Sequence, residues 1–137
     1  MKPIHSLLLA AALLAPGALH ARTIAWGTDL DSVLIDSSGT LLDASYTFEL
    51  GSFGSFLPDA SNLEQWLVNW KVFDRATAPA VEGFSPVDGL VASSAVLESD
   101  LTTDNNALPQ TNTFSAGEQA YIFVYNGLDL NSVVEWA

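Results

Sequence analysis

Short apolar runs separated by polar turn residues constrain the fold of this chain more than any other feature. Tyr46, Phe48 and Leu50 alternate with Thr47 and Glu49, which is the period-two pattern of a half-buried β-strand. Further strands are predicted at 23–26, 32–36, 41–42, 91–97, 121–125 and 133–136. Turn residues follow two of these runs, at 37–39 and at 126–127. The sequence therefore predicts a mostly β fold, built as an antiparallel sheet or a sandwich-like pair of sheets.

One segment, at about 61–74, departs from the strand pattern and is predicted to be an amphipathic helix. Ser61 is its expected N-cap, and Glu64 would complete a capping box. Apolar side chains recur at helical spacing on one face: Leu63, Trp66, Leu67, Trp70 and Phe73. The two indoles of this face suit either a sugar-stacking platform or packing onto the sheet. The flanking leucines favour packing.

The connecting segments are predicted at 51–56, 76–90 and 98–118. The first repeats a Gly-Ser-Phe unit and is expected to be a loop with two apolar anchors. The second is rich in proline, glycine and acidic residues, with Phe84 as its anchor. The third has the least apolar character and is expected to be a surface loop.

Residues 1–21 have the organisation of a cleavable secretion signal. A basic start at Lys2 precedes an apolar run at 7–14 and the helix-breaking pair Pro16-Gly17. Cleavage is expected after Ala21, with a cut after Gly17 as the competing choice. The apolar run is too short to span a bilayer, which takes about 20 residues. We therefore expect a secreted or cell-envelope protein with no stable membrane span in the mature chain.

Removal of this segment would leave a chain without imidazole or thiol, because both histidines, His5 and His20, lie inside it and cysteine is absent. A Ser-His-Asp triad, a cysteine nucleophile and a histidine-ligated zinc site are all excluded from such a chain. A lipid anchor on cysteine is excluded as well. No residue is assigned a catalytic role, and the protein is predicted not to be an enzyme.

The charge balance excludes a further class of partner. The chain has 16 acidic and 4 basic residues, for a formal net charge of −12, and loss of Lys2 would make the mature chain more negative still. Binding to a phosphate backbone needs clustered Lys and Arg, so nucleic acid is not expected as a partner. Anionic membrane surfaces are disfavoured for the same reason.

Residues 22–137 are expected to form a single acidic, β-rich domain, since hydrophobic residues make up 49% of the chain. The chain ends directly after the predicted strand at 133–136, without a terminal turn. We expect from this a domain that is cut short at its C-terminus.

Three runs of this chain resemble a group of uncharacterised bacterial secreted proteins that carry a PEP-CTERM sorting tail. They are 62–76 (NLEQWLVNWKVFDRA), 120–126 (AYIFVYN) and 135–137 (EWA), and the likeness extends to Trp26 and the loop at 51–56. The tail that defines the group does not occur in this sequence, so attachment to the surface by that route is not expected. The resemblance implies export and association with extracellular polysaccharide, and it transfers no catalytic residue.

Calcium is the cation that the acidic residues of this chain suit best, because Ca²⁺ takes six to eight oxygen ligands. The favoured candidate site is Asp100, Asp104, Asn105 and Asn106; the other candidates are Asp29 with Asp31, and Asp129 with Asn131. None of these groups has the spacing of a helix-loop-helix calcium site. Ordinary turn residues that bond to their own backbone are the competing and stronger interpretation.

Glycoside hydrolysis by two carboxylates is the one familiar hydrolytic reaction that such a chain could still support. Glu49 and Glu135 are the nominal pair, which would need a separation of about 5–9 Å across a cleft.

The sequence leads to a secreted, non-enzymatic component of the envelope or extracellular matrix, with calcium as a candidate stabilising ion. Its expected partners are an extracellular polysaccharide or an envelope protein. The alternative is a carbohydrate-binding module or a small carbohydrate-active enzyme, which would present aromatic side chains such as Tyr46, Tyr125 or Trp136.

Overall fold

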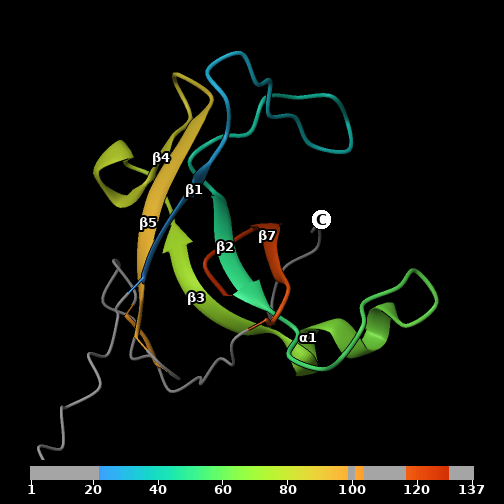
Figure 1. Ribbon diagram of the computed structural model, residues 1–137. Coiled ribbons are helices and arrows are strands. Elements are labelled where there is room, and N and C mark those ends of the chain that lie inside the picture. The colour runs from blue at the N-terminus through green and yellow to red at the C-terminus, as the bar shows by residue number, and fades with distance from the viewer. Residues whose placement is uncertain (1–21, 99–100, 104–116, 130–137) are drawn as a thin grey trace, which may run out of the picture.

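The computed structural model describes residues 22–98, 101–103 and 117–129, and over these ranges the fold is mostly β, as predicted (Figure 1). The expected signal segment at 1–21 and the expected strand at 133–136 lie outside the described residues.

Two antiparallel sheets make up the fold. The first sheet contains β1 (Arg22–Gly27), β5 (Leu90–Glu98) and β4 (Phe84–Ser85) in this order, and β6 (Leu101–Thr103) also pairs with β5. The second sheet contains β3 (Lys71–Ala76), β2 (Tyr46–Ser52) and β7 (Ala120–Asn126) in this order. Strand β2 is central in its sheet, whereas β7 and β1 each pair with one described strand.

The main hydrophobic core lies between the two sheets, which form a sandwich. Phe48 of β2 and Phe84 of β4 contact each other across this core, with ring centroids 4.9 Å apart. Other side chains from the two sheets and their connecting segments complete the cluster: Leu42, Tyr46, Ala76 and Val91, with Trp26, Leu34, Ala78 and Val124 packed against it. Phe84 is fully buried, so the anchor role predicted for it is confirmed.

The predicted strands at 23–26, 46–50, 91–97 and 121–125 correspond to β1, β2, β5 and β7. The segments at 32–36 and 41–42 meet only through one isolated bridge, Ile35 with Leu41, and are otherwise irregular. Asp36 supports the turn between them, because its carboxylate accepts the backbone N–H groups of Ser38 and Thr40. The predicted loop at 98–118 contains the short strand β6.

The helix predicted at 61–74 is much shorter than expected. A 3₁₀ turn at Leu63–Gln65 leads into α1 (Trp66–Asn69), Trp70 is already extended, and the next residues form β3. The predicted capping box is also wrong, since neither helical segment has a side-chain cap. Pairing of β3 with β2 is favoured over a longer helix, because it supplies backbone hydrogen bonds along β3 and buries Phe73.

Gly51 lies at a shift in register between β2 and β3. A Cβ atom at this position would stand 2.3 Å from the carbonyl oxygen of Lys71 and 2.5 Å from Cζ2 of Trp70. The close approach of a backbone and an indole ring explains why the strand carries glycine here.

Replacing Gly51 by alanine is expected to lower the free energy of unfolding by about 1–3 kcal/mol, since neither the Lys71 carbonyl nor the Trp70 ring can withdraw without disturbing the sheet. Urea denaturation followed by tryptophan fluorescence would measure the change. Ser55→Ala, in the exposed loop that follows, is the matched control and should stay within about 0.5 kcal/mol of wild type. Equal stability of the two variants would contradict the expectation.

Candidate functional site

The most polar buried cluster of the described residues surrounds Glu49, whose side chain is 1% exposed. Strand alternation directs Glu49 to the face of the second sheet that is turned away from the main core, where it lies opposite Arg75 in the β2–β3 register. The Arg75 guanidinium binds one carboxylate oxygen through Nε at 2.9 Å and through Nη2. The Tyr125 hydroxyl donates to the same oxygen at 2.9 Å, and the Trp70 indole N–H donates to the other at 2.7 Å.

This arrangement satisfies the Glu49 carboxylate with one cation and two neutral donors, from β3, β7 and the residue before β3. A buried charge is tolerated when it is paired and hydrogen-bonded in this way. Burial, and secondly the negative charge of Glu49, raise the pKa of the Tyr125 phenol well above its ordinary value. Tyr125 is therefore a hydrogen-bond donor in the folded protein over the whole physiological range.

The raised pKa of Tyr125 predicts a loss of stability in alkali. The folded state favours the protonated phenol, so this contribution to stability is complete below the unfolded-state pKa of about 10 and is lost as the pH rises toward the folded-state pKa. Urea unfolding measured at a series of pH values above 9 should show this decline. In Tyr125→Phe the part of the decline that comes from Tyr125 should disappear. A variant whose stability falls with pH as steeply as that of wild type would contradict the raised pKa of Tyr125.

Asp74 forms a second buried polar cluster, on the other face of the same sheet, and is fully buried. Its Oδ2 atom accepts the indole N–H of Trp26 at 2.8 Å and the hydroxyl of Ser93 at 2.7 Å. Because Trp26 belongs to β1 and Ser93 to β5, the carboxylate of β3 connects the two sheets through hydrogen bonds. The Arg75 backbone N–H donates to Oδ1 at 3.0 Å.

The two buried carboxylates do not form the pair that glycoside hydrolysis needs. Glu49 and Asp74 point to opposite faces of one sheet, so the sheet itself lies between them, and each carboxylate is occupied by structural donors. Glu135, the partner proposed for Glu49, lies outside the described residues. The chemistry that this geometry supports at Glu49 and Asp74 is structural.

The favoured calcium candidates, Asp100, Asp104, Asn105 and Asn106, lie outside the described residues, as does Asn131. Asp29, Asp31 and Asp129 are described and exposed. Within the described ranges, no three His, Cys, Asp or Glu side chains come together to hold a metal ion.

Several acidic residues outside the three candidate calcium groups act as turn formers. Asp36, Asp43 and Asp59 each accept hydrogen bonds from a backbone N–H two residues later. The Ser38 and Ser45 hydroxyls lower the pKa of Asp36 and Asp43, and the Ser61 backbone N–H lowers that of Asp59. These carboxylates therefore stabilise local turns.

The indoles of Trp66 and Trp70 pack as the core interpretation predicts. Both contact Phe53 and Phe123, with centroid distances between 5.0 and 6.3 Å. The Trp66 N–H donates to Asn62 Oδ1 at 2.9 Å, and the Trp70 N–H is used by Glu49. The pair covers the outer face of β2 and β7 and shields Glu49 from water.

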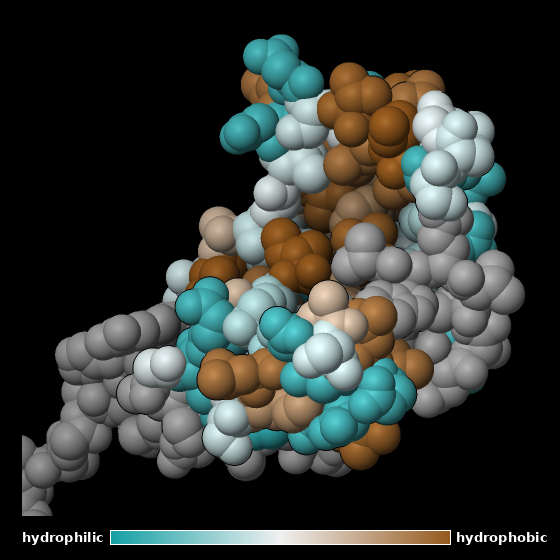
Figure 2. All heavy atoms as spheres, turned by 90° about the vertical axis from the view of Figure 1, so that its right-hand side faces the viewer, coloured by the Kyte–Doolittle hydropathy of each residue, from teal (hydrophilic) through white to brown (hydrophobic). Residues whose placement is uncertain are grey.

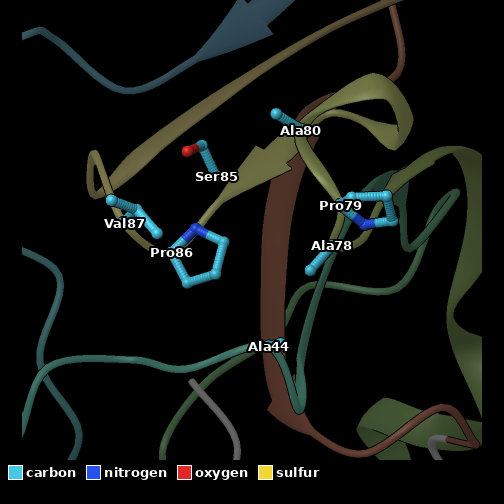
Figure 3. Close-up of a pocket in the computed structure, with 7 residues that line it drawn as sticks. All are labelled: Ala44, Ala78, Pro79, Ala80, Ser85, Pro86 and Val87. Carbon is cyan, nitrogen blue, oxygen red and sulfur yellow. The ribbon is translucent and has the colours of Figure 1, made fainter.

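The surface of the described part of the chain includes two mostly apolar cavities. The larger, of about 450 Å³, is lined by Ala44 and by the segments 78–80 and 85–87, which face each other in Figure 3. Its one polar side chain, Ser85, donates to Asp88 at 2.6 Å, so the lining offers little to orient a polar ligand. The smaller, of about 140 Å³, is apolar and lies on the side of the sandwich between β1 and β7, among Trp26, Phe48, Ile122 and Val124.

The sequence pattern points to Glu49 but reveals neither its burial nor its partners. Helical spacing places Arg75 near the end of the predicted helix instead of on a strand, and nothing in the pattern distinguishes Asp74 from the other acids. One feature of the sequence does indicate that a buried acid would pair with Lys71 or Arg75, because these are the only basic residues between 23 and 137. In the structure each of them forms an ion pair with a glutamate.

Comparisons of this chain with protein-family models, with curated proteins and with solved structures find no match. The resemblance to the PEP-CTERM group therefore stays a prediction. None of the helices in the described ranges is long and apolar enough to cross a membrane.

Proposed function

We propose that this protein is exported and serves as a non-catalytic structural component of the cell envelope or extracellular matrix. The observation that carries the proposal is the use of both buried carboxylates: Glu49 and Asp74 accept hydrogen bonds that join strands and sheets, and neither faces an open cavity with a second acid. The polar groups that an enzyme would direct toward a substrate are here directed into the fold.

The amino-acid composition supports the same role. A mature chain without thiol or imidazole is insensitive to the redox state outside the cell, and its strong negative charge opposes self-association. Stability without disulfides then depends on packing and on the two buried polar clusters, which explains their high degree of hydrogen bonding.

Export can be tested by expressing the full chain with a C-terminal epitope tag in a bacterial host and by sequencing the N-terminus of the product. We expect a product outside the cytoplasm that begins at Arg22. Leu9→Arg, which interrupts the apolar run at 7–14, is the matched control and should hold the full-length chain in the cytoplasm. A wild-type product that retains Met1 in the cytoplasm would overturn the proposal.

A carbohydrate-binding role is the second candidate, and the described aromatic side chains favour it less. Stacking on a sugar needs an exposed ring face, whereas Tyr46 and Tyr125 are buried and the rings of Trp66 and Trp70 pack against Phe53 and Phe123. Sedimentation of the purified protein with insoluble polysaccharides would test this role, since a protein without glycan affinity stays in the supernatant.

A further inference from the structure

The side of the sandwich between β1 and β7 leaves part of the main core open to solvent. The two sheets contact each other closely on the opposite side, where β3 lies against β5. Between β1 and β7 the core side chains Trp26, Val91 and Val124 line the cavity of about 140 Å³, and Ile122 of β7 is 46% exposed at its rim. We call this opening, lined by Trp26, Leu34, Phe48, Val91, Ile122 and Val124, the lateral groove.

Exposed aliphatic side chains also occur in the segment that contributes Leu34 to the lateral groove. The segment that follows β1 exposes Leu30, Val33, Ile35 and Leu41 by between 54% and 86%. Figure 2 shows apolar side chains in a band from the top of the molecule toward its middle. Apolar patches of this kind on a highly charged protein mark interaction sites.

The strands that border the lateral groove favour a polypeptide as its occupant. Within the described ranges β7 pairs with β2 alone and β1 with β5 alone, so both lie at the edges of the sheets that the structure describes. An edge strand can accept one further strand through backbone hydrogen bonds, while alternate side chains of the added strand fill neighbouring apolar pockets. Ile122 and Val124, which are two residues apart in β7, both line the lateral groove, as alternate side chains of a strand do.

The charges near the lateral groove restrict the partner further. Thr28 also lines the cavity, Asp29 and Asp31 are exposed directly after it, and Asp129 is exposed shortly after β7. The basic side chains that the structure describes, Lys71 and Arg75, are both held by carboxylates. A strand with basic flanks complements this surface, whereas an acidic one is repelled.

We propose that the lateral groove binds an extended apolar strand with basic flanks, contributed by another protein, which adds to the edge of β7. This inference rests on the proposed structural role and names the kind of partner through which the protein would assemble. The interaction joins backbone hydrogen bonds along β7 with burial of the partner's alternate side chains against Trp26 and Ile122.

Fluorescence anisotropy with the full mature chain, 22–137, tests the proposal directly. The probe is a labelled nonapeptide of alternating valine and threonine with a lysine at each end. We expect saturable binding that weakens in high salt, and binding of the same peptide with terminal glutamates that is at least about tenfold weaker. Absence of binding by the lysine-ended peptide would overturn the proposal.

Ile122→Asp introduces a charge at the rim of the lateral groove and should weaken binding about tenfold or more, without loss of folding because this side chain is already 46% exposed. Val68→Asp, at an 85% exposed position on α1, is the matched control and should bind like wild type. Equal affinity of the two variants would place the peptide elsewhere and overturn the proposal.

Two other occupants of the lateral groove would give different experimental results. A concentration-dependent dimer in sedimentation that Ile122→Asp abolishes would indicate a second copy of this chain. Peptide binding that appears only after deletion of residues 130–137 would indicate the chain's own C-terminal segment. Either result would overturn the proposed partner, and neither would affect export, which is measured independently by the N-terminal sequence of the secreted product.

Discussion

Replacing Glu49 by alanine is expected to lower the free energy of unfolding by about 3–5 kcal/mol. The substitution deprives the guanidinium of Arg75, the hydroxyl of Tyr125 and the indole of Trp70 of their shared acceptor at a site that is almost inaccessible to water. A buried charge pair that loses one partner leaves the other charge poorly solvated. Because a domain of this size is stable by about 5–15 kcal/mol, the variant would be close to unfolding at 25 °C.

Urea denaturation followed by tryptophan fluorescence is suited to this measurement, since Trp70 reports directly on the Glu49 site. Glu64→Ala removes an exposed carboxylate and should change stability by less than about 0.5 kcal/mol. Glu49→Gln keeps the size and one acceptor oxygen of the side chain, so it should lie between alanine and wild type. A Glu49→Ala variant as stable as Glu64→Ala would show that the cluster contributes nothing to the fold.

Replacing Phe84 by alanine is expected to have an effect of similar size, about 3–5 kcal/mol, for a purely apolar reason. Phe84 is fully buried between the sheets, and its ring lies 4.9 Å from that of Phe48. The lost contacts and the resulting cavity both contribute, because the sheets on either side are held by their own hydrogen bonds and cannot collapse into the space.

Val87→Ala provides the control for Phe84, since Val87 belongs to the same connecting segment and is 95% exposed. It should leave the unfolding midpoint nearly unchanged. A loss at Phe84 below about 1 kcal/mol would mean that the segment 76–90 contributes little to the core. The stability losses of Glu49→Ala and Phe84→Ala should be independent of each other, because Glu49 and Phe84 lie on opposite sides of β2.

The helix at 61–74 shows where local sequence patterns reach their limit. The spacing of Leu63, Trp66 and Trp70 is helical, and a helical segment does form there, but it ends at Asn69. Trp70 then turns to an extended conformation and bonds to Glu49, while Arg75 reaches the same carboxylate from β3. The spacing of neighbouring residues cannot predict these contacts, because they are made with β2, which lies about 20 residues earlier in the chain.

The sequence by itself determined the class of fold and the places of its main strands. Period-two alternation and β-branched or aromatic composition locate β2, β5 and β7, because these signals depend on neighbouring residues alone. The same holds for the side chains that are absent: with no cysteine, and no histidine after His20, composition alone excludes whole classes of chemistry from the chain that follows.

Only the tertiary structure decided which faces are buried. Thr47 and Glu49 alternate with apolar neighbours as in a half-solvated strand, yet every residue of β2 is buried, since this strand lies centrally and both its faces are covered. Whether a carboxylate faces water or an arginine depends on what packs above it, and Trp70, Arg75 and Tyr125 come from distant parts of the chain. The two buried acids and the lateral groove are products of this packing, which no pattern of adjacent residues encodes.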